Sequence, residues 1–319
     1  MGGSQAGLGM NWRGVGRRWK GILAGLVVLG AVYMKGFTAA GVHADSWHFW
    51  AADLNPLPWL GAMMLMAVYW ARYDRYRAEG GAPDLWSATR ALSFVAGVLL
   101  ALALWESPLN GFVVRSMTLY TFKLMGEFEL AAPLIVLGIP FGLIDTTRAR
   151  GRLWSGLRFL HHPLVTTVAL AIILALWDMS AQMALGLRDA LIFSILPGVY
   201  LGLGMMVWIQ SLRALPDFPN FSSHLRKGIY VWAMETTMMG MGAMWFWSAM
   251  KDLNPSIGEP LVWGLSRRTD IHMAGATMMA LSLPTMCLVF WHFWQWIASV
   301  VGVSENDDYE RVAVNRQEV

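Results

Sequence analysis

A few ionisable side chains lie within or at the edges of long apolar segments. Asp178 directly follows the uncharged run PLVTTVALAIILALW, and Asp270 and His272 lie at the start of another apolar segment. An ionisable residue at mid-bilayer costs at least about 2.5–3.5 kcal/mol on insertion scales, so each one requires a partner or a function. If Asp178, Asp270 and His272 meet at one membrane boundary, their carboxylates and imidazole could bind a metal ion, with a preference for cations harder than Cu(I). Alternatively, each side chain lies among lipid headgroups or pairs with a nearby arginine.

Three glutamates form a second polar group. Glu127 and Glu129 lie at the start of a predicted span, and Glu235, in VWAMETTMM, lies six or seven residues from the N-terminal end of another. Glu235 could form a hydrogen bond to Thr236, Thr237 or a neighbouring helix, or it could belong to a proton relay or an ion path. We therefore consider these glutamates as candidate intramembrane polar residues, and we assign no catalytic residue.

Methionines recur at helical spacing in two segments. They are Met234, Met238, Met241 and Met244 or Trp245 in one segment, and Met279 and Met286, together with His272, in the other. Thioethers and imidazoles are suitable ligands for Cu(I). Methionine also fills irregular gaps in apolar cores, so copper binding and simple packing both remain open for these stripes.

The composition places these residues in a membrane protein. The 319-residue chain is 56% hydrophobic and 14% charged, with a mean hydropathy of +0.45, whereas soluble domains carry about 25% charged residues. We predict an all-α polytopic membrane bundle, with a seven-span core and one N-terminal signal anchor, about eight transmembrane helices in total. No Walker, GxSxG or HExxH motif occurs, and we predict that the chain is not an enzyme. The apolar segments near the roughly 20 residues that a span needs are 20–41, 56–72, 88–105, 127–145, 163–183, 190–212, 228–250 and 272–299.

The basic residues predict the orientation of the chain. With a cytoplasmic N-terminus, 17 of the 24 Lys and Arg residues lie on the cytoplasmic side and 7, including Lys123, on the other. This bias predicts a multi-pass protein of the bacterial inner membrane with both termini in the cytoplasm. We divide the chain into a basic segment and signal anchor (1–44), a seven-span domain (45–300) and a polar cytoplasmic tail (301–319). Whether segment 1–44 is retained or is a signal peptide cleaved after Ala44 stays open.

Several apolar motifs follow one another in a defined order. They are LNPLPWLGAMMLMAVYWARYDRYR, WSATRALSFVAGVLLALALWESPLNGF, ELAAPLIVLGIP, HHPLVTTVALAIILALWDMS, LGLGMMVW, RKGIYVWAMETTMMGMG and LSRRTDIHMAGATMMALS. From about Trp47 onward, this order resembles the CtaG-related membrane proteins, which are assembly factors of caa-type cytochrome c oxidases. The resemblance implies a bundle of about seven spans and a role in building the oxidase.

The chain departs from this family pattern at the histidines. The resemblance implies histidine clusters at the outer ends of three spans, which a copper-handling factor would use. The corresponding positions hold Tyr120, Leu124, Asp178, Phe193, Leu196 and Pro197. Copper is therefore a possible cofactor, and Asp178, Asp270 and His272 are the reduced candidate metal site.

The sequence thus predicts a membrane assembly or biogenesis factor for a cytochrome c oxidase. Its expected partners are subunits of the oxidase or of another membrane complex, together with membrane lipids, and not nucleic acid. One alternative is a non-catalytic accessory subunit of a respiratory or other membrane complex. Another is a small-solute or ion transporter that uses Glu235 and the acids near the membrane boundary.

Overall fold

The described part of the chain is helical throughout. No strand occurs within it, which confirms the predicted all-α class. The predicted anchor 1–44 and the tail beyond residue 302 lie outside it. The computed structural model describes residues 56–106, 110–143, 152–177, 183, 187, 190–212, 221, 223–247 and 262–302.

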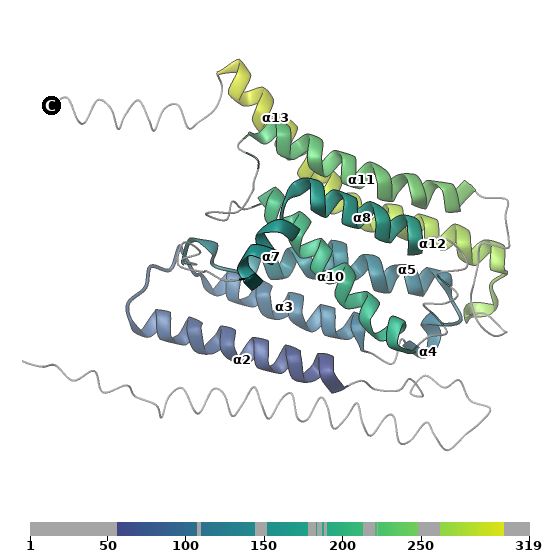
Figure 1. Cartoon of the computed structure of the whole chain (residues 1–319), viewed down its shortest axis with the longest axis horizontal. Coiled ribbons are helices and arrows are strands. Elements are labelled where there is room, and N and C mark those ends of the chain that lie inside the picture. The colour runs from purple at the N-terminus through teal and green to yellow at the C-terminus, as the bar shows by residue number, and fades with distance from the viewer. Residues whose placement is uncertain are drawn as a thin grey trace, which may run out of the picture.

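Long helices lie side by side in a bundle (Figure 1). They are α2 (Pro56–Ala78), α3 (Ala88–Trp105), α5 (Met117–Gly126), α6 (Ala132–Gly138), α8 (Pro163–Trp177), α10 (Ala190–Leu212), α11 (His224–Trp247), α12 (Arg267–Leu281) and α13 (Leu283–Val301). Shorter elements connect or extend them: α4 (Asn110–Val113), the π-helical turn η1 (Glu127–Ala131), η2 (Phe141–Leu143), α7 (Arg152–Leu160) and η4 (Val262–Gly264). The bounds of α3 and α10 agree with the predicted segments 88–105 and 190–212.

One central helical segment begins earlier than the sequence predicted. Elements α5, η1 and α6 follow one another without a break from Met117 to Gly138, so the predicted bounds of 127–145 for this segment are wrong. The hydroxyl of Ser116 caps the first turn by accepting a hydrogen bond from the Leu119 N–H at 3.3 Å. Polar residues between 116 and 129 lower the hydropathy of this stretch, which is why its sequence looks like a loop.

The last predicted segment, 272–299, consists of two helices. Helix α12 begins at Arg267 after the cap residue Ser266, and α13 begins at Leu283. Pro284 lies in the first turn of α13 and has no N–H to continue the hydrogen bonding of α12. The break at Ser282 therefore follows from the proline.

The described ranges contain fewer clearly membrane-spanning helices than the seven or eight spans that the sequence predicted. Within the described ranges, three are long and apolar enough to cross a membrane: Ala88–Trp105, Leu191–Leu212 and Arg267–Val301. The pair Trp154–Leu160 and Pro163–Leu174 is bent by 70° and would add a fourth if it forms one span.

Glycines allow two helix pairs to approach closely. A Cβ on Gly138 would lie 2.6 Å from the backbone nitrogen of Phe94, where α6 crosses α3. A Cβ on Gly275 of α12 would lie 2.4 Å from the carbonyl oxygen of Gly242 in α11. Small residues at such crossings are typical of membrane helix packing. A Cβ on Gly240 or Gly202, by contrast, would meet none of the described residues within 4 Å.

Candidate functional site

The carboxylate of Asp270 caps the start of α5. It accepts hydrogen bonds from the backbone N–H of Met117 at 2.6 Å and of Thr118 at 3.1 Å. It also accepts bonds from the hydroxyls of Ser116 at 2.9 Å and Thr118 at 2.8 Å. A negative charge at a helix N-terminus interacts favourably with the exposed N–H groups and the helix dipole. Asp270 therefore joins α12 to α5. The sequence did not predict this contact.

The other two residues of the predicted metal site are His272 and Asp178. His272 is half-buried on α12, and its ring centroid lies 6.3 Å from that of Phe246. Asp178 lies outside the described residues. Within the described ranges, no group of three or more His, Cys, Asp or Glu side chains could hold a metal ion. The site formed by Asp178, Asp270 and His272 stays a prediction.

Two of the three predicted glutamates meet in the core of the bundle. Glu129 of η1 and Glu235 of α11 are fully buried and lie within electrostatic reach of each other. The hydroxyl of Thr285 in α13 donates a hydrogen bond to Glu129. Ser282 lies beside Glu235, but its hydroxyl donates to the Met278 carbonyl at 3.0 Å. One oxygen of Glu129 and both oxygens of Glu235 accept no hydrogen bond from the described residues. We call Glu129 and Glu235 the carboxylate pair.

The third glutamate faces a buried lysine. Glu127 and Lys123 lie one turn apart on the α5–η1 segment and interact electrostatically, and Glu106 lies within the same reach. The Lys123 ammonium donates to Asn110 Oδ1 at 2.7 Å and lies 4.1 Å from the centre of the Phe193 ring. Lys123 is 3% exposed, so its side chain lies inside the bundle and not in an exposed loop. The signal that could have found this cluster is the spacing of Lys123 and Glu127, which suits an (i, i+4) pair on a helix.

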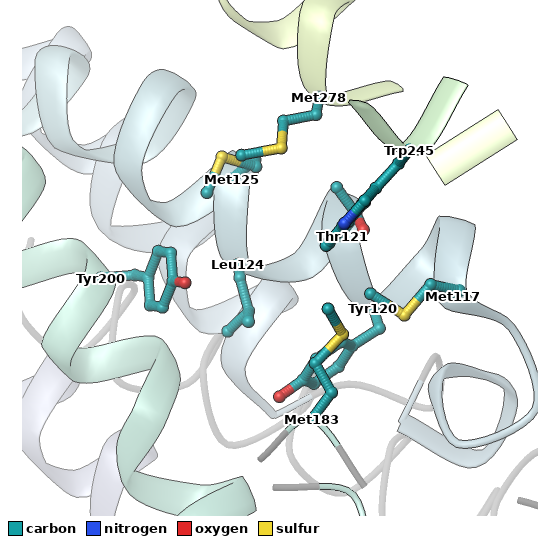
Figure 2. A pocket seen from close by; sticks show the side chains of 9 residues that line it. All are labelled: Met117, Tyr120, Thr121, Leu124, Met125, Met183, Tyr200, Trp245 and Met278. Carbon is teal, nitrogen blue, oxygen red and sulfur yellow. The ribbon is translucent and has the colours of Figure 1, made fainter. Parts of the chain in front are cut away.

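Methionines from distant segments line a small cavity beside α5. Figure 2 shows its lining: Met117, Tyr120, Thr121, Leu124, Met125, Met183, Tyr200, Trp245 and Met278. Its volume is about 10 Å³. Tyr120 and Leu124, which stand where the family resemblance implies histidines, both contribute to it. No methionine of the two predicted stripes lines this cavity, although Trp245, the alternative to Met244 in the first stripe, does. The methionines of the cavity were missed because the helix contacts bring them together.

A histidine pair lies at the opposite end of α11 and α13 from Asp270. The Nδ1 atoms of His224 and His292 are 3.1 Å apart, so one ring can donate to the other in the appropriate tautomer. His292 is fully buried, and Gly228 on α11 leaves room for it, because a Cβ there would lie 3.3 Å from the His292 Cβ. The sequence places His292 near the end of a span but gives no sign of its partner.

Comparisons with known proteins add evidence of a different kind. No curated protein and no solved structure matches the chain. A family model described as the cytochrome c oxidase caa3 assembly factor (Caa3_CtaG) matches residues 67–299. This match covers α3 to α12 completely, about half of α2 and most of α13. The chain belongs to the Caa3_CtaG family of cytochrome c oxidase caa3 assembly factors.

Proposed function

We propose that this protein is an integral membrane factor that assists the assembly of a haem-copper cytochrome c oxidase by contact with oxidase subunits. The match of the family model to residues 67–299 carries this proposal. The match covers nearly the whole described bundle, which supports assigning the assembly role to the bundle.

We further propose that seven helical segments of this bundle cross the membrane. They are α2, α3, the continuous segment from α5 to α6, α8, α10, α11, and α12 with α13. Three features make some of these segments shorter or less apolar than a typical span: the charged residues at the end of α2, the π-helical turn in the central segment and the polar residues of α11. Large apolar side chains are exposed on several of them, including Met64, Leu92, Leu164, Leu191 and Phe290, each more than 60% exposed. Such surfaces are rare on soluble monomers and suit contact with lipid.

Copper handling is a finer part of the proposal. Copper must be inserted into a haem-copper oxidase, so an assembly factor that binds the metal could deliver it as cargo. The site formed by Asp178, Asp270 and His272 is one candidate for a metal ion, although the Asp270 carboxylate already accepts four hydrogen bonds from the start of α5. This occupation favours a structural role for Asp270.

Gene deletion tests the proposed function. We expect loss of the haem spectrum and activity of the oxidase in membranes of the deletion strain, with recovery when the full-length chain is supplied in trans. Normal oxidase spectra and activity after deletion would contradict the proposal. Tagged protein should retain oxidase subunits only transiently, whereas co-purification in equal amounts would identify an accessory subunit instead.

A further inference from the structure

The cavity in Figure 2 is lined by four thioethers from separate parts of the chain. Met117 and Met125 belong to α5, Met278 belongs to α12, and Met183 lies between α8 and α10. Each of these side chains is at most 3% exposed. A cavity of about 10 Å³ has about the size that a single water molecule requires. It is thus the right size for one small occupant and too small for an organic ligand.

The lining is not purely apolar. The Thr121 hydroxyl and the Trp245 indole N–H are buried and have no hydrogen-bond partner among the described residues. Methionine commonly fills gaps in a core, but here four methionines leave a gap that also contains polar groups. Buried polar groups normally find a partner, and an unsatisfied one points to a bound water or ion.

The chemistry of the lining indicates which ion would fit. Thioethers are soft, uncharged ligands that select Cu(I) among the biological metals. The aromatic ring of Trp245 adds a surface that attracts cations. A hard divalent cation would instead require several carboxylate, carbonyl or water oxygens.

A buried monovalent cation also needs a negative charge nearby. Glu129 lies four residues beyond Met125, and Glu235 is its partner in the carboxylate pair. Neither glutamate forms an ion pair within the described ranges, and three of their four oxygens accept no hydrogen bond. If the two carboxylates share one proton, a net charge of −1 remains in the core. A monovalent cation about one helical turn away would neutralise it.

We propose that the methionine-lined cavity binds a single Cu(I) ion through thioether sulfurs, with the carboxylate pair of Glu129 and Glu235 as its counter-charge. This inference deepens the proposed assembly role and rests on it for its biological purpose, because it names the cargo and its site. The binding itself is independent of any oxidase and can be measured on the isolated protein.

Cu(I) binding to the full-length protein in detergent tests the proposal. We expect one equivalent of Cu(I) per chain in anaerobic competition with a chromophoric Cu(I) chelator. The double variant Met125→Leu/Met278→Leu should lower the affinity by about 10- to 100-fold, the scale on which metal sites respond to lost supporting groups. The matched control Met64→Leu/Met244→Leu, at two exposed methionines, should bind as the wild type does. Glu235→Gln should also weaken binding.

Each result decides the proposal. Absence of Cu(I) binding by the wild type, or equal affinity in the Met125→Leu/Met278→Leu variant, would overturn it. Leucine conserves volume, so the variant is expected to fold. If it does not fold, X-ray absorption spectroscopy of the copper-loaded wild type serves as the test. Sulfur ligands are expected, and a copper ion with only nitrogen or oxygen ligands would overturn the site. Failure of copper binding while deletion still abolishes the oxidase would refute this inference alone. If the isolated protein binds copper but the deletion strain still makes an intact oxidase, the proposed function alone would be refuted.

Discussion

Individual buried charges in this protein differ in how they are stabilised. Asp270 is stabilised by the N-terminus of α5, and Lys123 by Asn110, the Phe193 ring and two nearby glutamates. The carboxylate pair has only the Thr285 hydroxyl as a hydrogen-bond donor within the described ranges. Buried charges without a compensating partner are costly, so the pair is the place where a proton or cation is required. The carboxylate pair is therefore a stronger candidate for a functional role than Asp270 or Lys123, whose charges have partners.

The cap at α5 gives a prediction for Asp270. Asp270→Asn should lower the free energy of unfolding by about 1.5–3 kcal/mol, the usual contribution of hydrogen bonds to a charged group. Thermal unfolding in detergent, followed by tryptophan fluorescence, would measure this effect. Asp84→Asn, at an exposed position, serves as the control and should leave the melting temperature unchanged. If Asp270 acts chiefly as a metal ligand, its replacement would instead release metal and leave stability at the control level.

Whole elements were predicted well where the sequence is uniformly apolar. The segments 88–105 and 190–212 have no charged residue beyond Arg90, and their bounds agree with α3 and α10. Prediction failed between 116 and 131, because the polar residues there are buried against other helices, which hydropathy does not reveal. The π-helical turn η1 is a further feature without a sequence signal. Such turns occur frequently at functional sites, and η1 carries Glu127 and Glu129.

The crossing of α11 and α12 gives a prediction at the scale of elements. Gly275→Ala places a Cβ 2.4 Å from the Gly242 oxygen and 2.6 Å from the Phe246 nitrogen, so the two helices must move apart. Overpacking of this kind typically costs about 1–3 kcal/mol. In Gly240→Ala the new methyl group meets nothing within 4 Å, and alanine's higher helix propensity should preserve or raise stability. Equal melting temperatures of the two variants in detergent would contradict the close crossing.

At the scale of the molecule, the family and the helical class could be predicted from the sequence, whereas the site could not. The family motifs are contiguous stretches that occur in a fixed order along the chain, so they can be recognised from the sequence alone. The methionine cavity and the carboxylate pair depend on contacts between segments more than 100 residues apart, such as Met125 with Met278 and Glu129 with Glu235. The departures from the family histidines still pointed near the cavity, since Tyr120 and Leu124 line it.

The membrane orientation gives a prediction for the whole chain. The basic residues predict that the turn between α2 and α3 lies in the cytoplasm and that the start of α12 lies on the opposite side of the membrane. With the single native cysteine removed by Cys287→Ser, we compare the exposed positions Asp84→Cys and Arg268→Cys. A membrane-impermeant maleimide should label Arg268→Cys in intact spheroplasts and Asp84→Cys only after permeabilisation. The reverse pattern would contradict the orientation, and labelling of both without permeabilisation would contradict a barrier between the two ends of the bundle.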